Sequence, residues 1–140
     1  MINQFIHRYI RKLERRYAYD ATYMHELADI STSAFNRFVI MQMSGGQWGG
    51  GAPKDALFAS GIAGALVEDC GPCVQIASDM AVEAGVSPDT IRNLLSGTRS
   101  NSDAQLGFDY GLALLHGTDH LDQLRETVVS KWGKKALIGR

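Results

Sequence analysis

Apolar residues recur every three or four positions along most of the chain, and no segment alternates apolar and polar residues as a β-strand does. This pattern predicts an all-α protein, a bundle of about seven helices forming a single domain over residues 1–140. The expected helical segments are 2–17, a helical hairpin over 20–43, 55–69, 72–84, 88–96, 103–116 and 119–132.

One segment, 55–69, is small or apolar at nearly every position, which indicates a helix buried on most of its sides. Gly61, Gly64 and Ala65 lower its helix propensity but allow a neighbouring backbone to approach closely. We therefore expect this segment to be the central helix.

The helix predicted over 2–17 has a basic face, on which the positive residues lie largely between the apolar ones: Arg8, Arg11, Lys12, Arg15 and Arg16. Such a face can bind acidic lipid or nucleic acid, but it is more often a solvated face or a subunit contact. The pattern alone leaves these alternatives open.

Glycines interrupt the helical pattern over residues 44–51. This stretch lacks the Gly-Lys-Ser/Thr ending of a phosphate-binding loop, so we expect a loop or hinge.

The composition is that of an ordinary globular domain, with 140 residues, 45% apolar and 21% charged, and a net charge of −1. This charge balance gives no reason to expect nucleic acid as a partner of the whole chain. The N-terminus lacks the order of a signal peptide, and no apolar run reaches the ~18 residues of a membrane span. We expect a cytoplasmic protein with no membrane span.

The two cysteines of the chain, Cys70 and Cys73, are separated by two residues and lie between two predicted helices. Gly71-Pro72 marks a helix start, since proline is favoured at the first helical position, and this places Cys73 in the first turn. The free N–H groups of a first turn favour a thiolate, so cysteines in this setting commonly have a lowered pKa. The pair predicts a redox dithiol. Two buried structural cysteines and half of a metal site are the alternatives.

Cys-Gly-Pro-Cys also occurs at the thioredoxin active site, but there a strand leads into it, whereas here the preceding segment is a Gly/Ala-rich helix. The run 65–73, followed by Met80-Ala81, 84–87 and Ile91, instead resembles the all-helical alkylhydroperoxidase D-like, or carboxymuconolactone decarboxylase, superfamily. The resemblance covers roughly residues 55–133 and also includes Asp122-Gln123-Leu124-Arg125, Val128 and Trp132-Gly133. It implies cysteines that cycle between dithiol and disulfide, an antioxidant peroxidase or oxidoreductase activity, and a trimer or hexamer.

The chain departs from that family at the groups that move protons. The position four residues after the second cysteine, usually a relay histidine, is Ala77, and the position of the upstream glutamate falls near Phe58. Neither side chain can carry a proton. Glu68 is the nearest carboxylate and is our candidate for acid–base support of Cys70 and Cys73, because Asp79 lies six residues past Cys73 on another helix face.

The expected activity is therefore thiol–disulfide exchange or weak hydroperoxide reduction, with a hydroperoxide or a thiol/disulfide protein as the partner and no cofactor. A non-catalytic helical oligomer is one alternative, and a structural zinc site made of Cys70, Cys73, His116 and His120 is another. We also expect a homo-oligomer, because the apolar turn after Trp132 has little left in the chain to pack upon.

Overall fold

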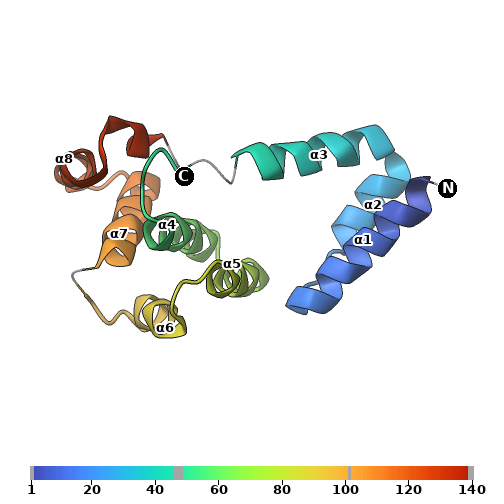
Figure 1. Ribbon diagram of the computed structural model, residues 1–140, viewed down its shortest axis with the longest axis horizontal. Coiled ribbons are helices and arrows are strands. Elements are labelled where there is room, and N and C mark those ends of the chain that lie inside the picture. Colours follow the sequence, from blue (N-terminus) through green and yellow to red (C-terminus); the bar gives the residue numbers. More distant parts are fainter. Residues whose placement is uncertain (1, 46–48, 101, 139–140) are drawn as a thin grey trace. The chain divides into compact units, whose positions relative to one another are not determined.

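The computed structural model describes residues 2–45, 49–100 and 102–138, and within these ranges all regular structure is helical (Figure 1). Eight α-helices are followed by a short 3₁₀-helix: α1 Ile2–Tyr17, α2 Thr22–Ile30, α3 Thr32–Gly45, α4 Lys54–Val67, α5 Gly71–Glu83, α6 Pro88–Ser96, α7 Asp103–His116, α8 Leu121–Trp132 and η1 Lys134–Leu137.

The all-α prediction is confirmed, and the bounds of α1, α6 and α7 agree with the sequence pattern. The expected number of about seven is one short of the eight α-helices described, and the predicted hairpin over 20–43 is present as α2 and α3, separated only by Ser31. Ser31 ends α2 and starts α3, since its hydroxyl oxygen accepts the N–H of Ala34 at 3.2 Å.

The chain forms two compact units, Met1–Gln47 and Trp48–Arg140. The boundary falls in the glycine-rich stretch predicted as a loop or hinge, whose residues 46–48 lie outside the described ranges. The structure also corrects the start of that stretch, because α3 continues to Gly45.

In the N-terminal unit, α1, α2 and α3 bury a small apolar core. Ile10 and Ala21 are fully buried, and Ala28 and Phe35 nearly so. Ile6 and Leu13 of α1 pack against this core beside Ile10, so the opposite side of α1 is the exposed one.

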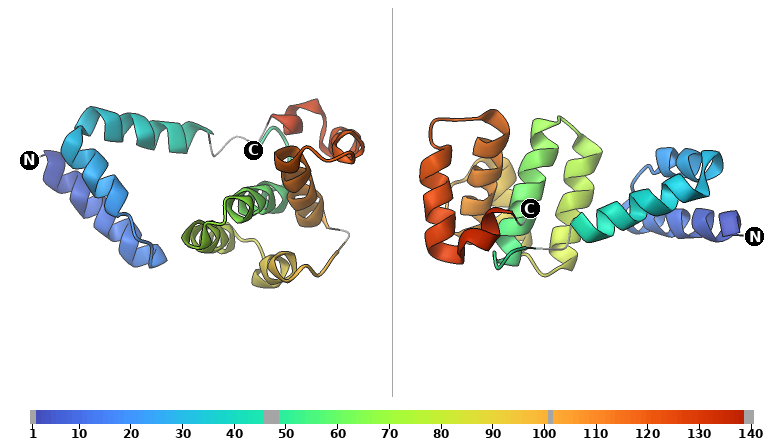
Figure 2. Two further views of the ribbon diagram at one scale, coloured as in Figure 1. Left: turned by 180° about the vertical axis from the view of Figure 1, so that it is seen from behind. Right: turned by 90° about the horizontal axis from the view of Figure 1, so that it is seen from above.

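In the second unit, α4 lies between α5 and α7, as the views in Figure 2 show. The helix apolar on all sides is therefore central, as predicted. Glycines on α7 allow the close contact: a Cβ at Gly107 would lie 2.2 Å from the carbonyl oxygen of Ala56 on α4, and one at Gly111 would lie 3.2 Å from Ser60 Cα. The surrounding core consists of Ala59, Ile62, Ala63, Ala81, Val86, Ile91, Leu94, Ala104 and Phe108.

The turn after α8 packs within its own unit, contrary to the expectation that it has little to contact. Ala136 of η1 is buried, and the backbone at Lys135 approaches Gly50 so closely that a Cβ there would lie 2.0 Å from the Lys135 oxygen. Of the helices described, none has both the length and the apolar character needed to cross a membrane.

Candidate functional site

Cys70 and Cys73 lie at the start of α5, joined by a disulfide. The connection from α4 is short: Glu68 is the C-cap of α4, and Asp69 adopts a left-handed conformation with φ 50°. Cys70 is then the N-cap of α5, where its N–H donates to the Ala65 oxygen at 3.2 Å and its carbonyl accepts the N–H of Val74 at 2.9 Å. Both neighbouring helices therefore fix the backbone of Cys70.

The two sulfurs are 2.11 Å apart and the Cα atoms 5.2 Å apart. The helix begins at Gly71, so Pro72 is its second residue rather than its first, and Cys73 is in the first turn as predicted. No acidic residue lies in this turn. The partial positive charge of the helix N-terminus consequently acts on the sulfurs without a competing carboxylate in the same turn.

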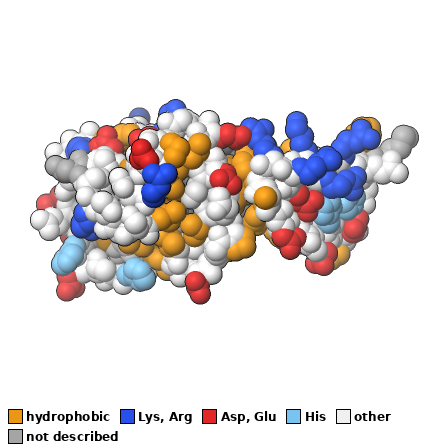
Figure 3. All heavy atoms as spheres, turned by 90° about the horizontal axis from the view of Figure 1, so that it is seen from below, with side chains coloured by type: hydrophobic (Ala, Val, Ile, Leu, Met, Phe, Trp, Pro, Cys, Tyr) orange, Lys and Arg blue, Asp and Glu red, His pale blue; other side chains and the backbone are white. Residues whose placement is uncertain are grey.

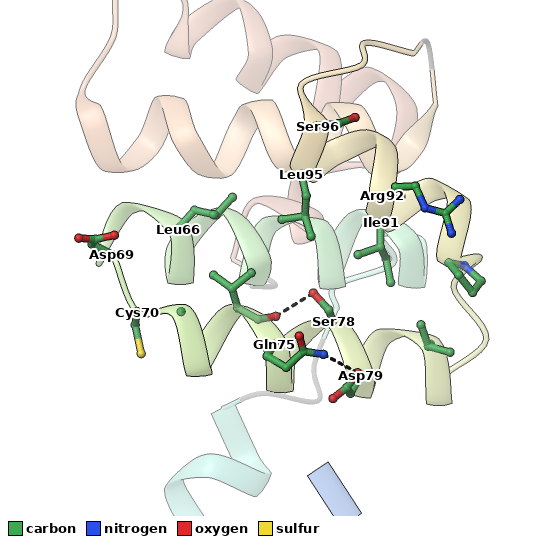
Figure 4. A pocket seen from close by; sticks show the side chains of 14 residues that line it. Leu66, Asp69, Cys70, Gln75, Ser78, Asp79, Ile91, Arg92, Leu95 and Ser96 are labelled. Atoms are coloured by element: carbon green, nitrogen blue, oxygen red, sulfur yellow. Dashed lines mark hydrogen bonds between the residues drawn. The ribbon is translucent and has the colours of Figure 1, made fainter. Parts of the chain in front are cut away.

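Both cysteines are partly buried. Cys70 also borders an open groove of about 950 Å³ between α4, α5 and α6, and Cys73 is not among the residues that line it. Figure 4 shows the groove following α5, with Cys70 at one end and Ile91 and Arg92 of α6 toward the other.

The groove has an apolar floor and polar margins. Its apolar side chains are Leu66, Val74, Val82, Pro88, Ile91 and Leu95. On α5, Gln75 donates to the Asp79 carboxylate at 2.9 Å and the Ser78 hydroxyl donates to the Val74 oxygen at 2.7 Å. An elongated, largely apolar group fits such a surface with one end beside Cys70.

The carboxylate beside Cys70 that lines the groove is not Glu68, which the sequence favoured for acid–base support. Glu68 is exposed and does not line the groove, whereas its neighbour Asp69 does, next to Cys70. Asp79 lines the groove as well, although it is on a different face from Cys73. In the sequence, only its position next to Cys70 pointed to Asp69 as a site residue. The left-handed backbone conformation of Asp69 could not be inferred from the sequence.

The position one turn after Cys73 offers no proton carrier. Ala77 is partly buried and packs against the core of the second unit, as does Phe58 on α4. His116 at the end of α7 and His120 before α8 are both exposed. Among the residues whose placement is described, no three His, Cys, Asp or Glu side chains gather as metal ligands, so the zinc alternative has no ligand set there.

A second cluster of titratable groups, which sequence reasoning missed, ties α1 to α2 in the N-terminal unit. Nδ1 of His7 and Nδ1 of His25 are 2.5 Å apart, His7 Nε2 donates to Asp29 at 2.8 Å, and His25 Nε2 lies 3.4 Å from the Glu14 carboxylate. The ring centroids are 4.8 Å apart and the planes within 6°. The ring centroids are farther apart than the two Nδ1 atoms by about two ring radii, so these near-coplanar rings meet edge to edge through their Nδ1 atoms. One Nδ1 therefore donates a hydrogen bond to the other.

This cluster affects the ionisation of Asp29. Hydrogen bonds from His7, and next from Asn3 at 3.1 Å, hold the pKa of the Asp29 carboxyl below its usual value. The spacing of His7 and Asp29 along the chain carries no recognisable motif, so the contact depends on how α1 and α2 pack.

Comparison of the chain with protein-family models, with curated proteins and with solved structures found no significant match to any of them.

Proposed function

We propose that the chain is a thiol–disulfide oxidoreductase whose redox centre is the pair Cys70 and Cys73. The observation that carries the proposal is the position of the pair: two sulfurs within bonding distance at a helix start, with Cys70 among the residues that line an open groove. The partial positive charge of the helix N-terminus would stabilise a thiolate. The reduced pair would then carry a deprotonated sulfur, which is the reactive form of cysteine.

The proposed cycle is balanced in electrons and protons. A partner dithiol transfers two electrons to the Cys70–Cys73 disulfide through a mixed disulfide, which yields two protein thiols and a partner disulfide. In the oxidative half, a thiolate attacks the terminal oxygen of a hydroperoxide, the O–O bond breaks, and an alcohol leaves after taking up a proton. The resulting sulfenic acid condenses with the second thiol to release water and restore the disulfide.

The two cysteines have different tasks in this proposal. Cys70 borders the groove, so we propose that it forms the mixed disulfide with a partner. Cys73, which the sequence favours as the low-pKa thiol, then resolves that bond. In a Cys73→Ser variant a small disulfide reagent should be trapped on Cys70, and trapping confined to the Cys70→Ser variant would reverse the two roles.

Hydroperoxide turnover should be slow. A positioned acid or base typically contributes ~10² to 10⁴-fold to such a step, and Ala77 supplies none. The matched variants Glu68→Gln and Asp69→Asn identify which carboxylate assists: the sequence favours Glu68, whereas the groove lining favours Asp69. Ala77→His should raise the rate by restoring a proton carrier one turn from Cys73.

A redox titration of the full chain, with mass spectrometry of the oxidised form, tests the central claim. We expect a reversible two-electron transition and an intramolecular Cys70–Cys73 disulfide. A pair that stays reduced at every accessible potential, or that oxidises only between chains, would leave the non-catalytic helical protein as the better description.

Three further expectations remain part of this proposal: membership of the alkylhydroperoxidase D-like superfamily, a cytoplasmic location and a homo-oligomeric state, as a trimer or hexamer. The cytoplasm fits a pair that cycles, since lasting disulfides are rare there. Exposed apolar side chains of the second unit, among them Leu114, Leu115 and Ile138, support self-association. Sedimentation of the protein as a monomer at micromolar concentration would contradict the oligomer.

A further inference from the structure

The outer side of α1 concentrates positive charge in the N-terminal unit. Of the six Lys and Arg residues before position 48, five lie on this helix. The one acidic residue of α1, Glu14, is on the inner side, where it faces His25 and accepts the N–H of Ala21 at 3.3 Å. The outer side therefore has cations with no carboxylate of the same helix among them.

Helix geometry brings these cations to one surface. At about 100° per residue, the basic residues fall within an arc of roughly 140°, opposite the fully buried Ile10. We call this surface the basic face; it consists of Arg8, Arg11, Lys12, Arg15 and Arg16, and all five are exposed. Figure 3 shows Lys and Arg side chains gathered over the N-terminal unit.

Most of this charge is not neutralised within the described residues, where Arg8, Arg11, Lys12 and Arg15 form no ion pair or hydrogen bond. Arg16 lies above the ring of Tyr17, 5.6 Å from its centroid. The second unit differs, because its three arginines before residue 139 each pair with a carboxylate: Arg92 with Asp89, Arg99 with Asp109 and Arg125 with Asp122.

Two aromatic side chains border the basic face along one edge. Phe5 and Tyr9 lie one turn apart and are 68% and 55% exposed. Ile30, at the end of α2, is 83% exposed, and the hydrogen bond between Asn3 and Asp29 holds the start of α1 beside that end. Exposed apolar groups thus lie toward the N-terminal end of α1, where the basic face begins with Arg8.

We propose that the basic face is a docking surface for an anionic lipid bilayer. Clusters of four or more Lys and Arg residues on a helix bind anionic headgroups, and aromatic rings at the border enter the interface between headgroups and acyl chains. A flat bilayer can meet the basic face together with Phe5 and Tyr9, because all of these side chains lie on the same side of α1. The proposal does not depend on the redox pair.

The arrangement favours a bilayer over nucleic acid. Arg8, Lys12 and Arg15, at the centre of the exposed arc, can pair with the phosphates of a bilayer or of a nucleic acid, so the exposed apolar side chains decide between the two. The apolar groups Phe5 and Tyr9 are confined to one edge, as expected for a helix lying in an interface.

Co-sedimentation of the full chain with vesicles tests the proposal, using phosphatidylcholine alone and an equal mixture of phosphatidylcholine and phosphatidylglycerol. Wild type should bind the mixed vesicles and not the neutral ones, and added salt should weaken binding. The double variant Arg11→Gln/Arg15→Gln should bind roughly 25-fold more weakly, at about fivefold per cation. The matched control Lys134→Gln/Lys135→Gln makes the same charge change on η1 and should bind like wild type.

A second pair of variants tests the aromatic edge. Phe5→Ser/Tyr9→Ser should weaken binding to mixed vesicles, whereas Ile40→Ser/Met43→Ser, which removes similarly exposed apolar groups from α3, should not. Absence of binding to mixed vesicles, or equal losses in the basic-face variant and its charge-matched control, would overturn the proposal. Binding to a duplex or single-stranded oligonucleotide that requires Arg11 and Arg15, without vesicle binding, would also overturn it in favour of a nucleic-acid surface.

Discussion

Replacement of Gly107 by alanine is the sharpest test of how α7 packs on α4. The added Cβ would lie 2.2 Å from the Ala56 oxygen, 2.6 Å from its Cα and 2.7 Å from its carbonyl carbon. All three atoms are backbone, so no side-chain rotation can relieve the overlap and the two helices must move apart. α4 and α7 hold much of the core of the second unit, so the whole unit should be affected.

The expected change in the free energy of unfolding of Gly107→Ala combines two opposing effects. Overpacking a core costs typically about 1–3 kcal/mol, and a backbone obstacle places this site at the upper end of that range. Alanine recovers up to ~1 kcal/mol of helix propensity relative to glycine. A net loss of roughly 2 kcal/mol follows, which is a substantial part of the ~5–15 kcal/mol that stabilises a typical domain.

Urea denaturation of three variants provides the measurement and its controls. Gly111→Ala, whose nearest contact would be 3.2 Å, should lose less stability than Gly107→Ala. Gly64→Ala, on α4 with nothing within 4 Å, should gain up to ~1 kcal/mol. If Gly107→Ala is as stable as Gly64→Ala, with unchanged dependence on denaturant, α4 and α7 are not in the close contact described above.

Other predictions concern single residues outside that contact. Because the pKa of Asp29 is held below its usual 3.8, its contribution to the free energy of unfolding is present above that pH and disappears as the pH falls through the lowered pKa. The protection of amides in α1 and α2, relative to their intrinsic exchange rates at the same pH, should fall there, and Asp29→Asn should remove this acid dependence. Gly97→Ala should cost about 1 kcal/mol in thermal unfolding, because the C-cap of α6 has φ 74°. Gly50→Ala, with φ 58° and the Lys135 oxygen 2.0 Å away, should destabilise more than Gly51→Ala, whose nearest contact is 3.6 Å; equal effects would mean that η1 does not pack at Gly50.

Local chemistry made much of the fold predictable. The start and end of α7 agree with the sequence because Ser102 accepts the Gln105 N–H and Gly117 takes a left-handed conformation, both standard helix boundaries. The end of α4 was placed two residues late, since Asp69 leaves the helix in a left-handed conformation that its residue type does not require.

The site was predictable only in part, because it combines local and tertiary features. Placing Cys73 in a first turn needed only Pro72 and the spacing of the pair. The groove depends on how α4, α5 and α6 pack, so the roles of Cys70 and Asp69 at its end could not be read from the chain. The edge-to-edge contact of His7 with His25 likewise joins residues that no motif connects.

The disulfide connects residues only three positions apart, the N-cap and the first turn of the same helix. It joins no two distant elements and closes a very short loop, so it restricts the unfolded chain far less than a bond across the fold would. Opening the bond should therefore leave every helix of the second unit in place. A bond of this kind can be made and broken repeatedly without the protein unfolding, which is a property that a redox cycle needs and a structural crosslink does not.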